Sequence, residues 1–395
     1  MAVKTEIIKE ADMPKKRKGR LSIGILTLAA FFLILCSSDV AIEYMKKGLL
    51  LCARTVIPSL FPFMVISELV VSSGIGARIS RLFARPMRWL FGVGEAGAAA
   101  YLLGLVCGFP IGARTAVSMY DCKIVTKQEL ERLLTFCNNP GSAFVISAVG
   151  ISLFGNKKIG IALYVCVILS SLAIGFVGKY FLGYKKGAGA SSTLIIPTDF
   201  SVKTITDAVH SSAISMLTVC AYVVFFSAFV GCIGALLSRF SLPREVIACV
   251  FGFFELSSGV GAAAQVGDRL RAVILCALFV GWSGLSVGFQ IMSVASGRNI
   301  SFKSFFIAKA AQGILCALFM GIAVKFVLRD SIYDTASDYP YKDAAATSVY
   351  LPLASFVASI LLLLALILTI SADKRKTLSK GHKKLKKGID KGDFV

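Results

Sequence analysis

The sequence has 395 residues, of which 56% are hydrophobic and 16% charged, and its mean hydropathy is +0.78. Soluble domains use apolar residues for only about half of their positions, so this composition places the chain in a membrane. The formal net charge of +21 does not indicate nucleic acid, because Lys and Arg gather in the two tails and in short loops beside apolar runs. There they indicate topology and attraction to anionic lipid head groups.

Apolar stretches recur along the chain. A membrane-spanning helix needs about 20 apolar residues, and eight stretches qualify or nearly do. They predict an all-α polytopic membrane protein with about eight spans: 21–38, 56–73, 133–153, 158–182, 214–237, 272–296, 305–328 and 347–371. Two further stretches, 96–119 and 247–265, are too interrupted to be simple spans.

The two ends of the chain are basic. Segment 1–20 precedes the first span, which we interpret as a retained signal anchor, because no small-residue cleavage site follows it; a cleaved signal peptide is the alternative. The tail 372–395 is basic as well, so we predict that both termini are cytoplasmic, which requires an even number of crossings. The segment 44–54 carries positive charge that this topology places outside, and an interfacial helix would account for it.

The order of features in the first half recurs in the second half. IGARISRLF (75–83) resembles IGALLSRF (233–240), and each precedes an interrupted stretch, a short charged segment, a broken span and an intact span. The halves, about 55–182 and about 211–328, have opposite orientations in the eight-span topology. Inverted repeats are common in transporters, with the binding site at the repeat interface. We therefore expect one membrane transporter domain, 21–371.

Glycine and proline interrupt the apolar runs at four places, GFPIG (108–112), NNPG (138–141), FELSSGVG (254–261) and GWSG (281–284). Backbone groups cannot stay unpaired in lipid, so a break at membrane depth must line a cavity or be buried in protein. We predict that GFPIG and FELSSGVG are the tips of two re-entrant helical hairpins. NNPG and GWSG are then unwound points in the spans that follow each hairpin.

The four breaks predict a binding site. Helix ends that face a cavity attract anions through free N–H groups and the positive end of the helix dipole. Ser and Asn side chains add donors, and Trp282 offers a flat face for an aromatic ring. The predicted site for a small polar or anionic substrate comprises Pro110, Gly112, Arg114, Asn138, Asn139, Ser142, Glu255, Ser257, Ser258, Gly259, Trp282, Ser283 and Ser286.

The charged residues in apolar stretches have competing interpretations. Glu255 either binds a proton, a sodium ion or a basic group of the substrate, or forms an ordinary ion pair with a neighbouring arginine. Arg114 attracts a carboxylate, snorkels to the cytoplasmic surface or balances Asp121. Lys309, near the start of its span, is expected to snorkel. Any single glycine or serine is more often a packing residue, because small residues let membrane helices approach.

The sequence gives little support for catalysis. His210 and His382 have no partner at metal-ligand spacing, and no nucleophile elbow or P-loop lysine is present. Most of the eleven cysteines lie inside apolar stretches without paired spacing, so we interpret them as core residues: Cys36, Cys166, Cys220, Cys276 and Cys316. We therefore expect no enzyme, no cofactor and no metal site. A membrane-embedded enzyme would need Glu255 or Asp121 to act with further catalytic residues, which the sequence does not identify.

Several blocks resemble a known family. They are VIPSLFPFMVISELV (56–70), GLVCGFPIGAR (104–114), LLTFCNNPGSAFVISAVG (133–150), FFELSSGV (253–260) and GWSGLSVGFQ (281–290). In this order they resemble the YlbJ/SpoVV family of sporulation integral membrane proteins, in the nucleoside-recognition or gate-domain group, over about residues 21–371. The CNNPG block also resembles the broken seventh helix of concentrative nucleoside transporters, whose fold has two inverted repeats with re-entrant hairpins.

The resemblance implies an endospore-forming bacterium and transport of dipicolinic acid across the outer forespore membrane into the spore. Dipicolinate is a flat aromatic dianion that would suit the helix tips, Arg114 and Trp282. We expect a substrate-holding domain that moves against a scaffold, with anionic lipid at the basic tails and no nucleic acid, and a homo-oligomer stays open. The alternatives are a carrier of nucleosides or other small metabolites, and a non-transporting anchor of a sporulation complex.

Overall fold

The computed structural model describes residues 28–72, 85, 87–94, 97–181 and 202–328, and every regular element in these ranges is a helix. The chain is therefore an all-helical, polytopic membrane protein, as its hydropathy predicts. Several predicted features lie wholly or partly outside the described residues: the segment 1–20, the first span at 21–38, the repeated motif IGARISRLF at 75–83, the last span at 347–371 and the tail 372–395.

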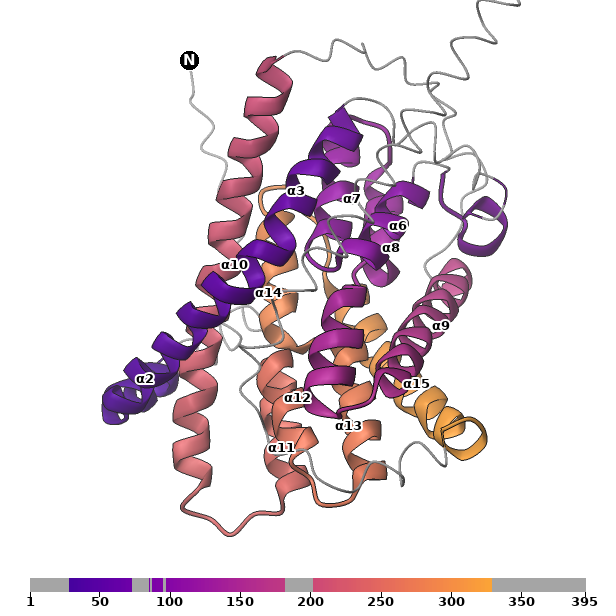
Figure 1. Ribbon diagram of the computed structural model, residues 1–395. Helices are drawn as coiled ribbons and strands as arrows, with labels where there is room; N and C mark the ends of the chain where they lie inside the picture. Colours follow the sequence, from indigo (N-terminus) through magenta and orange to yellow (C-terminus); the bar gives the residue numbers. More distant parts are fainter. Residues whose placement is uncertain (1–27, 73–84, 86, 95–96, 182–201, 329–395) are drawn as a thin grey trace, which may run out of the picture. The chain divides into compact units, whose positions relative to one another are not determined.

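Four helical segments in the described ranges are long and apolar enough to cross a membrane (Figure 1). They are α9 (Lys157–Phe181), α10 (Val202–Leu237), α13 with α14 (Arg269–Trp282 and Gly284–Val294) and α15 (Lys303–Phe326). A fifth candidate is the bent pair Leu28–Cys36 and Ser38–Arg54, whose parts meet at 95°. The predicted spans at 158–182, 272–296 and 305–328 agree with these helices, whereas α10 begins well before 214.

The first described helices run into one another without a loop. They are α2 (Ser38–Leu51), the π-helix η1 (Cys52–Val56) and α3 (Ile57–Ser72), which contains Pro62. α3 coincides with the predicted span at 56–73, and both α2 and α3 pack against α10. The segment 44–54 is thus helical and continuous with α3. Its interfacial position stays a prediction.

Each interrupted apolar stretch forms a pair of short helices, as predicted. The stretch 96–119 contains α6 (Gly97–Cys107) and α7 (Ile111–Asp121), and the stretch 247–265 contains α11 (Arg244–Phe254) and α12 (Leu256–Ala264). The two helices of each pair pack against each other (Figure 1).

Glycines make the contact inside both pairs. A Cβ atom on Gly104 would approach the Cα atom of Gly112 to 3.1 Å, and one on Gly259 would overlap Gly252. The facing glycines lie at similar distances along the chain on either side of each tip. Each pair is therefore an antiparallel hairpin whose backbones approach too closely for larger side chains.

The two broken spans are interrupted where the sequence predicts. α8 (Lys127–Phe136) ends before residues 137–142, and the π-helix η3 (Ala143–Leu153) follows. Ser283 alone separates α13 from α14, and its φ of 73° is left-handed.

The predicted start of the span at 133–153 is wrong. α8 begins at Lys127 with a charged first turn, because Thr126 and Glu129 form a capping box that starts the helix there. Each of these two side chains accepts a hydrogen bond from the backbone N–H of the other. The apolar part of this region is therefore η3 alone, which is too short to cross a membrane.

Two large apolar clusters hold the helices together. One cluster joins η3 and α9 to α12, α13 and α15, and the other joins α6, α7 and α8 to α14. Phe109, at the tip of the first hairpin, packs against both clusters. On the outside, α15 exposes a stripe at helical spacing, whose members are 56–61% exposed: Ile307, Ile314, Leu318 and Ile322. Such a stripe is suited to contact with lipid.

The cysteines of the described ranges are all free. Cys166, Cys276 and Cys316 are buried core residues, as predicted, and Cys220 is half-buried. Cys36 is exposed, so its assignment to the core is wrong. It lies where the first described helix bends into α2, on a face that no other described helix covers.

Candidate functional site

The tip of the first hairpin packs against the Asn-Asn-Pro-Gly break. Gly108 has a φ of +85°, and a Cβ atom on it would lie 2.5 Å from the backbone nitrogen of Gly141. Gly141 in turn faces the carbonyl oxygen of Cys107. The glycines in both motifs are thus needed for a backbone-to-backbone contact between the tip and the break.

The two asparagines of this break end α8. The amide nitrogen of Asn138 donates to the carbonyl of Leu134 (3.0 Å), and that of Asn139 donates to the carbonyl of Phe136 (2.9 Å). The last carbonyls of a helix have no partner within it, and Pro140 cannot supply an N–H group. The amide donors of Asn138 and Asn139 therefore cap the end of α8. The sequence had assigned these donors to a substrate.

A buried lysine completes this break from the second half of the chain. Lys309 of α15 is 2% exposed, and its Nζ lies 3.0 Å from the carbonyl oxygen of Asn138 and 2.8 Å from Oε1 of Gln312. Gln312 is fully buried and donates to Oδ1 of Asn139 (2.7 Å). The prediction that Lys309 snorkels is wrong, because α8 packs against one side of the start of α15 and Lys309 lies on that side.

Glu255 forms the tip of the second hairpin. Its side chain is buried, and its two carboxylate oxygens accept hydrogen bonds from the backbone N–H groups of Ser257 (2.9 Å) and Ser258 (2.6 Å). In the described part of the chain no arginine pairs with it. Glu255 is thus the N-cap of α12, and its negative charge occupies the place where the sequence predicts an anionic substrate.

The second tip packs against the Gly-Trp-Ser-Gly break, as the first does against its own. A Cβ atom on Gly284 would lie 3.0 Å from the backbone nitrogen of Leu256. The Trp282 indole nitrogen donates to the carbonyl of Phe253 (3.1 Å), and the two rings stack at 5.9 Å between centroids. One face of Trp282 is therefore already covered by an aromatic ring of the protein.

The remaining predicted residues lie close to these breaks. Ser283 separates α13 from α14 and donates to the carbonyl of Val280 (3.4 Å). Ser286 is buried one turn further along and accepts from Gln290 (3.5 Å), while Ser142 precedes η3. Gly112 faces the Cys137 carbonyl oxygen and Gly259 faces Gly252, so both glycines contact backbone.

Arg114 connects the first hairpin to two long helices. Its Nη2 lies 3.1 Å from Oε2 of Glu68 on α3 and 2.6 Å from the hydroxyl of Ser211 on α10. The residue is 7% exposed, and Nη1 is buried without a partner in the described chain. Arg114 neither snorkels nor balances Asp121.

Asp121 has a different partner. It binds Arg298 through two hydrogen bonds of 2.7 and 2.6 Å, and these bonds raise the pKa of the Arg298 guanidinium above its ordinary value. The pair links the end of α7 to the loop before α15. Among the described residues, no three His, Cys, Asp or Glu side chains gather as metal ligands.

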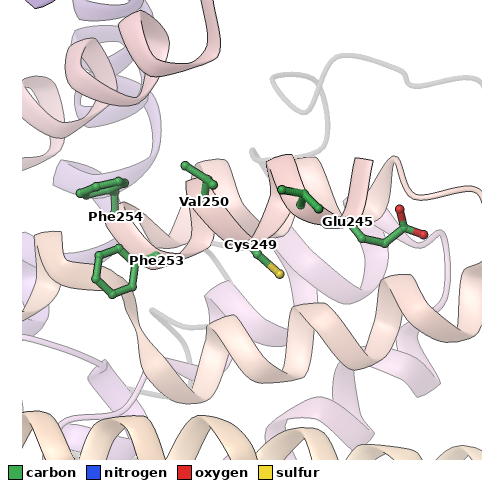
Figure 2. A pocket seen from close by; sticks show the side chains of 6 residues that line it. Glu245, Cys249, Val250, Phe253 and Phe254 are labelled. Carbon is green, nitrogen blue, oxygen red and sulfur yellow. The ribbon is translucent and has the colours of Figure 1, made fainter. Parts of the chain in front are cut away.

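A groove along α11 reaches the second hairpin tip at Phe253 and Phe254 (Figure 2). Its volume is about 410 Å³, and it is lined by Glu245, Val246, Cys249, Val250, Phe253 and Phe254. The lining is apolar and its one charge is negative, so the groove is unsuited to a dianion. It contains none of the predicted site residues.

The two tips and two breaks therefore form two packed pairs, each within its own half of the chain. The chain is similar to the sporulation integral membrane protein YlbJ of Bacillus subtilis (strain 168). The two are 29% identical over 337 residues, which cover 75% of this chain and 82% of YlbJ. No family model matches the chain, and no solved structure matches it.

Sequence reasoning missed two partnerships at this site. Glu68 and Lys309 were visible as charges inside apolar runs, a pattern that by default indicates function. Their partners, Arg114 and Asn138, are far away in the sequence, so no local spacing predicts the pairs. That the predicted residues bind a substrate stays a prediction.

Proposed function

We propose that this chain is a sporulation membrane transporter that moves dipicolinate across the outer forespore membrane. The sporulation role is supported by similarity to YlbJ, whose name describes a sporulation integral membrane protein. The substrate comes from the family resemblance of the sequence blocks. Transport is supported by the packing of two buried hairpin tips against two helix breaks. Broken backbone at membrane depth is typical of transporter binding sites.

Two inverted repeats and eight spans are part of this proposal. Each half contains a hairpin, a broken helix and a long helix in the same order. Contacts between the halves are reciprocal, since α7 contacts α14 and α12 contacts η3. In the same way α15 contacts α8 and α9 contacts α13. A twofold relation between the halves would produce this exchange of partners.

Within this site we propose that the first hairpin holds the anion. Among the described residues no side chain caps α7, and the Ile111 N–H already donates to the carbonyl of Gly108 (3.1 Å), so the following N–H groups and the helix dipole are the ones that a carboxylate would meet. Arg114, in the first turn of α7, adds a buried positive charge with an unpaired Nη1. The start of α12 is already neutralised by Glu255.

The proposed mechanism moves the hairpins and broken helices, as a substrate-holding domain, against a scaffold. Arg114 lies on the hairpin and is bonded to α3 and α10, so a substrate carboxylate would compete with Glu68 for it. Both termini are proposed to be cytoplasmic, with segments 1–20 and 372–395 at anionic lipid. No catalysis, cofactor or nucleic acid is part of the proposal.

Binding of dipicolinate to the purified full chain in nanodiscs, measured by calorimetry, tests this function. A nucleoside and a simple dicarboxylate are the comparison ligands. We expect saturable binding that is selective for dipicolinate and roughly ten- to a hundredfold weaker in Arg114→Gln, because a charged hydrogen bond contributes about 1.5–3 kcal/mol. Arg271→Gln is the matched control, since its side chain is 67% exposed and pairs with Glu245 and Asp268.

Other outcomes would redirect the proposal. Binding of the nucleoside without dipicolinate would keep the transporter and replace its substrate. If a folded sample binds none of the three ligands, and deletion of 372–395 abolishes function while Arg114→Gln does not, the chain is an anchor instead.

A further inference from the structure

The most deeply buried charge in the described chain lies at the end of α8. Lys309 is 2% exposed, and its neighbours Gln312, Asn138 and Asn139 are fully buried. Within the described ranges, no Asp or Glu lies within ion-pair distance of Lys309. An isolated buried charge is expensive, so its partners must stabilise it in another way.

Those partners are neutral oxygen atoms at the C-terminal end of a helix. Nζ contacts the carbonyl oxygen of Asn138 (3.0 Å), just beyond α8, and the amide oxygen of Gln312 (2.8 Å). The C-terminal end of a helix carries partial negative charge, which favours a cation there. Oδ1 of Asn138 is a further buried acceptor without a partner in the described chain.

Neutral oxygen ligands of this kind hold small monovalent cations. Unwound backbone carbonyls and the C-terminal ends of half-helices coordinate sodium ions or protons in transporters. The arrangement is also specific, because Lys309 and Gln312 lie one turn apart on α15 and contact the consecutive residues Asn138 and Asn139. α15 thus holds the break in one register.

We propose that the Lys309 ammonium is a tethered cation that fills a small monovalent-cation site between α15 and the break after α8. Removing this side chain therefore opens the site to free ammonium. A covalently attached cation cannot leave with the substrate. A second consequence rests on the proposed transport function: sodium binding at this break does not drive transport.

Chemical rescue of Lys309→Ala tests the site without any substrate. Thermal unfolding of the full chain in detergent is followed in chloride salts of N-methylglucamine, sodium, potassium, ammonium and methylammonium at constant ionic strength. We expect wild type to unfold at the same temperature in all five salts. Lys309→Ala should unfold several degrees lower in N-methylglucamine and regain at least half of the loss, saturably, in ammonium or methylammonium.

Two further variants keep this test decisive. Lys309→Met fills the space with an apolar chain of similar length, so it should be destabilised and show no rescue by any cation. Lys303→Ala removes an exposed lysine from the first turn of the same helix and should behave as wild type. Equal Tm values for Lys309→Ala in all five salts, or equal rescue of Lys309→Met, would overturn the proposal.

A Lys309→Ala protein that does not fold in N-methylglucamine should be recovered when ammonium is present throughout purification. If no cation recovers it, the site is not a cation site and the proposal fails. A separate binding experiment tests the second consequence. Dipicolinate binding to wild type should be unchanged when sodium replaces N-methylglucamine. A sodium requirement would overturn the consequence for transport. Absence of any dipicolinate binding contradicts the proposed function alone, since the thermal arm needs no substrate.

Discussion

Replacing Glu68 by glutamine removes the negative partner of Arg114 at nearly constant side-chain volume. The ion pair has a distance of 3.1 Å, with side chains 9% (Arg114) and 24% (Glu68) exposed. Two unit charges about 4 Å apart attract by about 4 kcal/mol at an effective dielectric constant of about 20. Loss of one partner from a buried pair costs about 3–5 kcal/mol. Water reaches part of Glu68 and Ser211 still binds Arg114, so we expect Glu68→Gln to cost about 2–3 kcal/mol.

Thermal unfolding in detergent measures this loss. About 2–4 °C per kcal/mol applies to chains of 150–250 residues, so on this scale the Tm of Glu68→Gln should fall by roughly 4–12 °C. Arg114→Gln and the double variant complete a cycle, in which the double variant should lose little more than Arg114→Gln alone. Glu43→Gln is the control, because it removes an exposed pair with Lys47 of even shorter distance, 2.7 Å, and should leave the Tm unchanged.

The same variant should bind an anion more tightly. Under the proposed function Glu68 would compete with a substrate carboxylate for Arg114, so Glu68→Gln should lower the Kd for dipicolinate several-fold while it lowers the Tm. A Tm loss no greater than that of Glu43→Gln would refute this reasoning. So would strictly additive losses in the cycle, since they would mean that Glu68 and Arg114 stabilise the fold independently.

Three further predictions concern the hairpins and their links. Gly104→Ala places a Cβ against a backbone carbonyl and should cost about 1–3 kcal/mol by thermal unfolding, whereas Gly261→Ala, with open space around it, should be neutral or slightly stabilising. Glu255→Ala should cost about 0.5–2 kcal/mol through loss of the α12 cap, and Glu255→Gln should recover part of it, because an amide oxygen still accepts a hydrogen bond. Arg298→Ala should cost at most about 1 kcal/mol, and less at high salt, because its pair with Asp121 is partly exposed. Equal effects of Gly104→Ala and Gly261→Ala, no recovery in Glu255→Gln, or a salt-independent loss in Arg298→Ala would each contradict the corresponding reasoning.

The helix breaks were predictable because their causes are local. Pro110 and Pro140 lack an N–H group, and Gly108 and Gly284 take positive φ values that other residues avoid. These restrictions act on the chain at the residue itself, so the sequence alone locates the ends of α6, α8 and α13. The long apolar helices α9 and α15 were predictable for the same reason, since hydropathy is a local property.

The partners of the charged residues were not predictable in the same way. The expectation that Lys309 snorkels considers only its distance from the end of its own helix. Burial depends instead on α8, which precedes Lys309 by more than 170 residues and covers it. Glu255 shows the opposite case, because its partners are the backbone N–H groups two and three residues further along the chain. The signal was local there, and the capping pattern of a carboxylate before Ser257 and Ser258 could have been read from the sequence.

The two hairpins differ in one electrostatic respect that would decide where the anion of the proposed function binds. In the second hairpin the protein supplies its own carboxylate, that of Glu255, to the start of α12. A substrate anion would have to displace Glu255 and lose its own hydration at the same time. In the first hairpin no side chain of the described residues caps α7, and the buried Arg114 in its first turn has a donor without a partner among them. If the halves are related by a twofold axis, this difference breaks the symmetry of the site. A dianion such as dipicolinate then has one favourable end to approach, and Arg114 rather than Glu255 should control its affinity.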